Sequence, residues 1–198
     1  SGGNSLSIIN TTVSAAAGTS TIRFIEGASN NTVTNCTVSG SSTGLILDVT
    51  GTVLFSTSSV PGGNSSNTIS YNNIGPAGAS LPSKANLGNG STTTTAIGNS
   101  GIVINNNNIF DYFGAAVSSS GIATNGGCNT WSITNNRLYQ TGTRTWTTGA
   151  LHAGIDIRSA TATSGAQGFT ITGNTIGFAS NTQTGTYTLT GSTGKFQG

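Results

Sequence analysis

The sequence predicts an all-β protein folded as a parallel β-helix, and three observations predict this fold class. Gly, Ser, Thr and Asn interrupt every window of helical length, and no apolar pattern repeats at helical spacing. Short alternating segments, typical of strands, occur along the whole chain. A six-residue motif with apolar ends and asparagine near its centre occurs six times. Repetition of one unit with variable connections is typical of a solenoid.

Composition limits the kinds of protein that this chain can be. Its 198 residues are 33% hydrophobic and only 5% charged, so Ser, Thr and Asn must keep the surface hydrated. The net charge of +2 comes from scattered residues without a basic stripe, so nucleic acid is not an expected partner. No apolar run is long enough to predict a membrane span. The absence of Met predicts a processed or internal piece of a larger extracellular or cell-surface protein.

The repeated motif is an apolar residue, four mostly small or polar residues, and a second apolar residue. Its copies are IINTTV (8–13), VTNCTV (33–38), ISYNNI (69–74), INNNNI (104–109), ITNNRL (133–138) and ITGNTI (171–176). Their irregular spacing suits about six coils that share a core and differ in their loops.

Asparagine at the centre of the motif has two physical explanations. A sharp bend needs a residue that tolerates left-handed backbone angles, and Asn does this better than other non-glycine residues. Stacked coils also place such side chains about 4.8 Å apart, where each amide can donate to the next. The expected asparagine ladder consists of Asn10, Asn35, Asn72, Asn107, Asn136 and Asn174, with Thr11 and Cys36 at the ladder position of the first two coils.

Further strands and two lateral loops are expected between these corners. The strand candidates are STIRFIEG (20–27), TGLILDVT (43–50), GTVLFSTS (51–58), AGIDIRS (153–159) and GTYTLTG (185–191). Segments 75–100 and 139–150 are expected to be lateral loops within one domain, residues 1–198, and the first holds two of the three prolines. Cys36 and Cys128 fall in different coils, so we expect two unbridged thiols.

These repeats resemble the right-handed, single-stranded parallel β-helix proteins of the pectin-lyase-like superfamily, particularly NosD-like and bacterial surface proteins. The resemblance rests on the six hexamers and covers residues 6–176. It implies a right-handed β-helix. Polysaccharide lyases, glycoside hydrolases, tailspikes, adhesins and scaffolds all share this fold, so the resemblance does not select an activity.

The acidic residues do not form a recognisable catalytic set. They are Glu26, Asp48, Asp111 and Asp156, which the coil assignment places in separate coils. A glycosidase needs two carboxylates about 5 to 9.5 Å apart, and Glu26 and Asp48 come nearest to this requirement. Calcium needs several carboxylates together. We therefore predict no catalytic residue, no metal and no cofactor, and favour a protein that is not an enzyme. Asp156 and Arg158 are expected to form a surface ion pair.

The most distinctive loop is YQTGTRTWTTGALH (139–152). It brings together Tyr139, Arg144, Trp146 and His152, and an exposed Trp beside Arg is a common way to hold a sugar ring. One hypothesis is a glycan-binding face made from these four side chains. The alternative is that Trp146 folds back and covers the outer side of the β-helix.

Three functions remain open at this point. The favoured one is a structural or adhesive extracellular segment that contacts flanking coils of its parent chain and glycans or other cell-surface molecules. The second is a carbohydrate-binding, lyase-like or hydrolase-like β-helix. The third is an ice-binding solenoid, because Thr alternates in 141–149 and 182–194, although other coils carry Ile, Ser, Asn and Arg at equivalent positions.

Overall fold

The computed structural model describes residues 3–16, 18–44, 50–90, 94–158, 166–191 and 194–197. Its regular structure is almost entirely short strands, and one 3-10 helix, η1 (Thr95–Ile97), occurs in the described part. All pairings between the described strands are parallel. The prediction of an all-β protein with parallel strands is confirmed.

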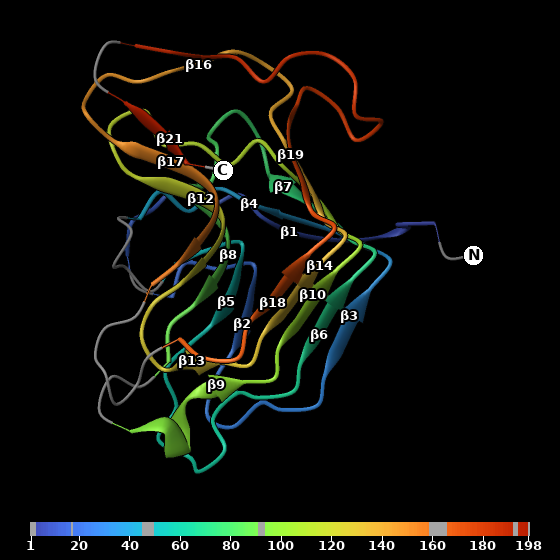
Figure 1. Ribbon diagram of the computed structural model, residues 1–198, viewed down its shortest axis with the longest axis vertical. Coiled ribbons are helices and arrows are strands. Elements are labelled where there is room, and N and C mark those ends of the chain that lie inside the picture. The colour runs from blue at the N-terminus through green and yellow to red at the C-terminus, as the bar shows by residue number, and fades with distance from the viewer. Residues whose placement is uncertain are drawn as a thin grey trace.

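Three parallel sheets form the body of the molecule (Figure 1). Sheet A contains β1 (Leu6–Asn10), β4 (Cys36–Gly40), β7 (Asn73–Pro76), β11 (Asn108–Phe110), β15 (Arg137–Tyr139) and β19 (Thr175–Phe178). Sheet B contains β2 (Ile22–Phe24), β5 (Val53–Phe55), β8 (Lys84–Gly88), β12 (Ser119–Thr124), β17 (Leu151–Ile157) and β21 (Lys195–Gln197). Sheet C contains β3 (Thr32–Thr34), β6 (Thr68–Ser70), β10 (Val103–Asn105), β14 (Ser132–Thr134) and β18 (Thr170–Thr172).

The chain passes through the three sheets in a constant order, from C to A to B. The first complete pass is β3, β4 and β5, and the last is β18, β19 and β21. Neighbouring strands of a sheet therefore come from successive passes, which is consistent with a parallel β-solenoid. Two short pairs join the connections: β9 (Asn99–Ser100) with β13 (Cys128–Asn129), and β16 (Arg144–Thr145) with β20 (Leu189–Thr190).

Five of the six hexamers lie in register with one another. Their first apolar residues are neighbours across sheet C, in the order Val33, Ile69, Ile104, Ile133 and Ile171. Their last apolar residues are neighbours across sheet A, in the order Val38, Ile74, Ile109, Leu138 and Ile176. Side chains at these positions point to the same side because strands alternate with a period of two. In the internal passes they are buried and form the main core.

At the corner between sheets C and A, the third and fourth positions of the hexamer have different roles. The third position has left-handed backbone angles, with φ between 55° and 67° at Asn35, Tyr71, Asn106, Asn135 and Gly173. The fourth position carries an inward amide in four of the five passes. Asn72 Nδ2 donates to Asn107 Oδ1 at 3.1 Å, Asn107 Nδ2 to Asn136 Oδ1 at 3.0 Å, and Asn136 Nδ2 to Asn174 Oδ1 at 2.9 Å.

The predicted register of the first hexamer was wrong, and two residues of the expected ladder, Asn10 and Asn35, do not occupy its position. Ile8 is the neighbour of Val38, so it occupies the last position of a hexamer and not the first. Asn10 therefore lies beyond the corner, where its Nδ2 donates to the Ser20 carbonyl at 3.2 Å. Asn35 occupies the left-handed third position and is half-buried. The fourth position of its pass belongs to Cys36, whose backbone N–H donates to Asn72 Oδ1 at 2.9 Å.

The segment 75–100 is not one lateral loop, because it contains β8, a fully buried strand of sheet B. The sequence did not predict this strand, because its segment KANLG contains the polar residues Lys84 and Asn86. Lys84 is accommodated because its Nζ donates to the Gly44 carbonyl at 2.8 Å. The strand candidates at 20–27, 51–58, 153–159 and 185–191 contain β2, β5, part of β17 and β20, whereas residues 45–49 lie outside the described part. Cys36 and Cys128 are both free and buried, as predicted.

Candidate functional site

The connections from sheet A to sheet B form a side extension, defined as residues 111–118, 140–150 and 179–191. It lies at the top of Figure 1, where β16 pairs with β20. Phe113, Trp146 and Ala150 make a small hydrophobic core of their own, covered in part by Leu81, Ala115 and Leu189. The side extension is thus an ordered compartment beside the main core.

Two of the four side chains predicted to hold a glycan, Tyr139 and Trp146, are buried and pack against other aromatic rings. Tyr139 is 8% exposed and stacks on Phe110, with ring centroids 5.4 Å apart. Trp146 is also 8% exposed, and its ring centroid lies 6.1 Å from that of Phe113. Neither ring presents a face to solvent, so Trp146 folds back as in the alternative hypothesis.

Arg144 is engaged by partners within the side extension. Its Nη2 forms an ion pair with Asp111 Oδ1 at 2.5 Å, and its Nε donates to Gln140 Oε1 at 2.7 Å. Asp111 also accepts hydrogen bonds from the backbone N–H of Thr141 at 2.7 Å and from its hydroxyl at 2.6 Å. These contacts connect the arginine and Asp111 to the turn at 140–144.

His152 lies at the junction of the side extension and the main core. Its side chain is fully buried, stacks on Tyr112 at a centroid distance of 5.2 Å, and shares a 2.7 Å hydrogen bond between Nδ1 and Ser119 Oγ. Its Nε2 contacts the Tyr187 hydroxyl. Burial, with a smaller contribution from the Arg144 charge, lowers the pKa of His152 from 6.5 to about 3. The ring is therefore neutral at pH 7.

Ser119 and His152 have the chemistry of a nucleophile and its base, but both side chains are shielded from solvent. Ser119 is fully buried in β12, so no substrate could reach its hydroxyl. The phenols around the pair are also protonated. Burial raises the pKa of Tyr187 to about 12 and that of Tyr112 well above 10. Taken together, packing and internal hydrogen bonds occupy all four of the side chains predicted to hold a glycan.

Each carboxylate that the structure describes contacts a partner of its own. Asp111 pairs with Arg144, Asp156 Oδ2 accepts from Arg158 Nε at 2.8 Å, and Glu26 Oε2 accepts from the Ser59 hydroxyl at 3.0 Å. The predicted Asp156–Arg158 pair is confirmed. Asp48, and with it the suggested Glu26–Asp48 pair, lies outside the described residues. Within the described ranges no three His, Cys, Asp or Glu side chains are grouped as a metal site would require.

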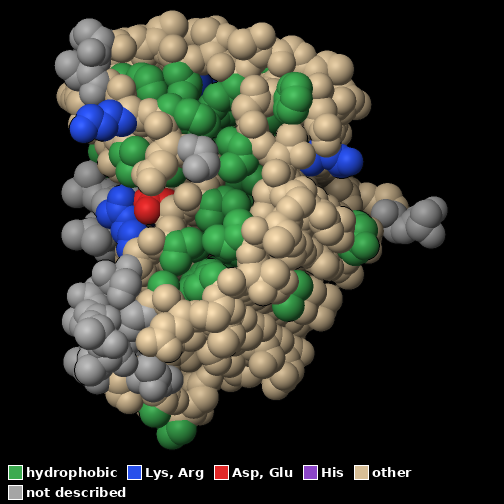
Figure 2. Space-filling view, in the orientation of Figure 1, with side chains coloured by type: hydrophobic (Ala, Val, Ile, Leu, Met, Phe, Trp, Pro, Cys, Tyr) green, Lys and Arg blue, Asp and Glu red, His purple; other side chains and the backbone are tan. Residues whose placement is uncertain are grey.

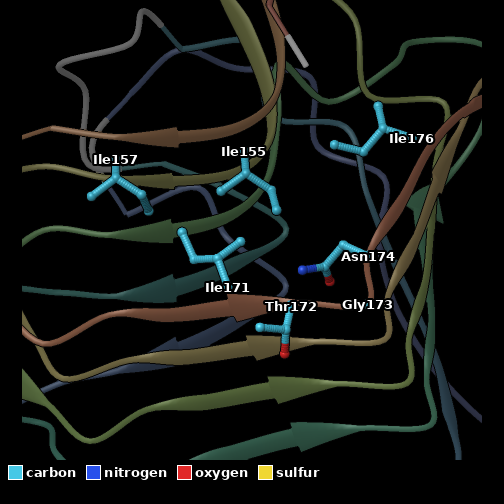
Figure 3. Close-up of a pocket in the computed structure, with 7 residues that line it drawn as sticks. All are labelled: Ile155, Ile157, Ile171, Thr172, Gly173, Asn174 and Ile176. Atoms are coloured by element: carbon cyan, nitrogen blue, oxygen red, sulfur yellow. The ribbon is translucent and has the colours of Figure 1, made fainter.

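The strongest candidate site is the exposed end of the main core at β18, β19 and β21. A pocket of about 410 Å³ opens there, and Figure 3 shows its apolar side chains around the space between the sheets. Its lining comprises Ile155, Ile157, Ile171, Thr172, Gly173, Asn174 and Ile176. One pass earlier, the equivalent residues Ile122, Thr124, Ile133 and Leu138 are at most 1% exposed, whereas Ile171 is 43% exposed.

The polar groups at this end include a backbone N–H whose equivalents in earlier passes all form hydrogen bonds. The backbone N–H groups of Cys36, Asn72, Asn107 and Asn136 each donate to the Oδ1 of the asparagine in the next pass. Asn174 accepts from Asn136, and its Nδ2 donates to the Ile133 carbonyl at 2.8 Å. Its own backbone N–H has no such acceptor among the described residues. Likewise, no described strand pairs with the outer edges of β18, β19 and β21.

The chemistry of this end suits another stretch of backbone better than a charged ligand. No charged side chain lines the pocket. On the face shown in Figure 2, hydrophobic side chains gather in the middle and the few charged ones lie near the margins. Three unpaired parallel edges, an apolar centre and one free asparagine N–H are what an added coil would cover.

The repeated hexamer predicted a corner at Ile171, Asn174 and Ile176 but did not predict that this corner lies at an exposed end. ITGNTI is the last of the six copies in the given sequence, and its pairing across the sheets appears only in the structure. Ile155 and Ile157 were recognised only as strand residues. Their role depends on sheet B ending beside sheet C, which the spacing does not show.

Two further observations concern the whole chain. The described part contains no helix of the length and hydropathy needed to cross a membrane. Comparison of the chain with protein-family models, with curated proteins and with solved structures gave no match.

Proposed function

We propose that this chain is a structural segment of an extracellular surface or secreted protein, and that its open end receives a further coil of β-helix. The observation that supports this is the exposed end itself. Its apolar pocket, three strand edges that no described strand pairs with, and the backbone N–H of Asn174 together repeat the surface that each earlier complete pass presents to its successor.

The proposed fold behind this function is a right-handed parallel β-helix of six coils, β1 and β2 belonging to the first. In this proposal the buried amides of Asn72, Asn107, Asn136 and Asn174 act as an asparagine ladder. Each internal amide is held by several hydrogen bonds. Asn107, for example, donates to Asn136 Oδ1 and to the Ile69 carbonyl and accepts from Asn72. Such a row stabilises the stacking of coils without requiring charges.

The occupant that fits is a coil with strands for all three sheets and asparagine at the fourth hexamer position. A second copy of the described chain would fit less well. Its β1 and β2 could lie over β19 and β21, but its first strand in sheet C is β3, which belongs to the following pass. Stacking of two copies would therefore leave β18 and Ile171 uncovered. A coil of a parent chain or of a homologous chain would cover them.

Composition supports the extracellular setting and the adhesive part of the proposal. Only 5% of the residues are charged, so Ser, Thr and Asn hydrate the surface. A long, rigid rod with such a surface does not depend on ion pairs. Loops such as the side extension would then be displayed along the rod, where glycans or other cell-surface molecules could contact them. No observation favours an active site at Tyr139, Arg144, Trp146 and His152, since these side chains are buried or engaged.

The proposal can be tested by supplying the missing coil. Gln197 is the neighbour of Ala153, and Ala153 is the neighbour of Ser120, so a copy of residues 122–158 appended after Gly198 would continue the register. We expect a higher melting temperature and slower hydrogen exchange at the Asn174 amide. The matched control carries the same extension with the copies of Ile133 and Leu138 changed to Ser and that of Asn136 to Ala. Equal melting and exchange in the two extended chains would contradict the proposal.

A further inference from the structure

A polar groove runs along the outside of the corner between sheets C and A. It has a volume of about 390 Å³ and lies on the opposite side of the backbone from the buried asparagines. Its lining comprises Tyr71, Asn106, Asn135, Arg137, Gly173, Thr175 and Gln183. These residues come from four successive passes and from the loop at 179–186 of the side extension. None of them was among the predicted binding residues.

The corner's backbone geometry produces the groove. Tyr71, Asn106, Asn135 and Gly173 all occupy the left-handed third position, so successive residues line one side at the strand spacing of about 4.8 Å, or about 14 Å in all. Tyr71 is 55% exposed and supplies an aromatic wall at one end. At the other end, Gly173 has no side chain and Asn135 Oδ1 lies close to it, 2.2 Å from where a Cβ would stand.

The groove contains hydrogen-bond donors that have no partner in the described part of the chain. The Arg137 side chain is exposed and forms no ion pair or hydrogen bond there, whereas Arg144 and Arg158 each hold an aspartate. The side-chain amides of Asn106 and Asn135 are likewise without protein partners among the described residues. No Asp or Glu lines the groove. A planar guanidinium with five N–H donors is well suited to a carboxylate or a sulfate.

We propose that this groove binds a ligand that carries an oxyanion, either a carboxylate or a sulfate group. Arg137 would hold the oxyanion through two parallel hydrogen bonds, and the amides of Asn135 and Asn106 would bond neighbouring hydroxyl or carbonyl groups. The ring of Tyr71 would contact the uncharged remainder of an extended ligand about 10 Å or more away. This binding site is distinct from the proposed stacking surface, because it lies on the outside of the corner, although Gly173 borders both.

The test uses the full chain and three probes at low ionic strength: inorganic sulfate, a glucuronate-containing tetrasaccharide and a neutral tetrasaccharide. Binding is followed by calorimetry and by the side-chain amide NMR signals of Asn106 and Asn135. We expect the two anionic probes to bind and the neutral one not to bind. Arg137→Gln should weaken both anionic probes at least tenfold, and Arg137→Lys should weaken them less. Tyr71→Ala should weaken only the tetrasaccharide, by several-fold.

The matched control is Lys195→Gln, which removes the same charge from an exposed position outside the groove. It should leave all three affinities unchanged. Equal weakening by Lys195→Gln and Arg137→Gln would overturn the proposal, since it would indicate an effect of net charge alone. Equal binding of the neutral and charged tetrasaccharides, or no binding of either anionic probe at millimolar concentration, would also overturn it. Binding of sulfate alone would support the site and limit its ligand to a small anion.

Discussion

The side-chain amide of Asn107 donates a 3.0 Å hydrogen bond to Oδ1 of Asn136, one strand further along the same corner. The same Oδ1 accepts the backbone N–H of Asn107 at 3.0 Å, so one side chain holds both the backbone and the side chain of its neighbour. Both amides are at most 1% exposed. A polar row can therefore replace apolar side chains at this corner, because each internal member finds a full set of partners.

Replacing Asn107 with Ala should destabilise the protein. The change leaves the Ile69 carbonyl and the Asn72 amides without their partners in a buried place, and each unsatisfied group costs about 1–3 kcal/mol. We expect the free energy of unfolding in urea to fall by about 3 kcal/mol or more. Asn106→Gly is the control, since this half-buried position has left-handed backbone angles that glycine tolerates, and the change should alter stability by only about a few tenths of a kcal/mol. Similar losses in both variants would contradict this account of the row.

Stability should fall as the pH decreases from about 6.5, because of His152. Its pKa is about 3 in the folded protein against an ordinary value of 6.5 in an unfolded chain, so below pH 6.5 the unfolded chain binds a proton that the folded protein excludes. The stability is thus fully present above pH 6.5 and is lost as the pH falls towards 3. Well below 6.5 the slope is about 1.4 kcal/mol per pH unit.

Urea titrations at pH 7, 6 and 5 would measure this loss, and His152→Gln should flatten the curve over that range. The imidazole signals of the folded protein provide a direct check. A ring that titrates near pH 6.5 in the native spectrum would show that burial does not hold His152 neutral.

The two arginine ion pairs should differ in strength. The side chains of Arg144 and Asp111 are 17% and 10% exposed, and further hydrogen bonds from Gln140 and Thr141 complete their arrangement. Arg144→Met should cost about 2–3 kcal/mol, since it leaves Asp111 charged and poorly solvated. Arg158→Met removes a more exposed partner, 33% accessible, and should cost less than about 1 kcal/mol. Thermal unfolding of the two variants checks this ranking, and a larger effect at Arg158 would reverse it.

Gly88 should not tolerate a methyl group. A Cβ at this position would lie 2.5 Å from the Trp131 ring and 2.9 Å from the Cys128 sulfur, in the fully packed part of the core. Overpacking of this kind costs about 1–3 kcal/mol, so Gly88→Ala should lower the melting temperature. Gly78→Ala is the matched substitution, because no atom lies within 4 Å of the new Cβ. Chemical denaturation of the pair would refute this packing argument if both variants were as stable as the parent.

Much of the main core could be predicted from the sequence because its rules are local. Alternation along a strand decides which side of the backbone Ile104 and Ile109 face, and the four-residue interval between them decides where the bend falls. The same reasoning failed for the first hexamer, because IINTTV matches the pattern of the later copies but lies in a different register. Ile8 lies beside Val38, and only the pairing of strands 30 residues apart reveals this.

The side extension shows why the sequence was insufficient for the site. Trp146 and His152 carry the side chains of a binding loop, yet Phe113, Tyr112 and Tyr187 from other passes pack against them. Whether an aromatic ring is a ligand platform or part of a core depends on these distant neighbours. The groove at Arg137 was missed for the converse reason, since asparagine donors are common along the whole sequence and only the stacked passes bring these ones together.

By itself, the sequence determined the kind of strand, the position of the corner and the inward apolar rows of the main core, because side-chain direction and left-handed bends depend on a few adjacent residues. The tertiary structure alone decided which loop residues are buried, where the stack of sheets ends and which amides remain free to bind. These properties depend on segments that lie 30 to 40 residues apart in the chain and meet only when successive passes stack.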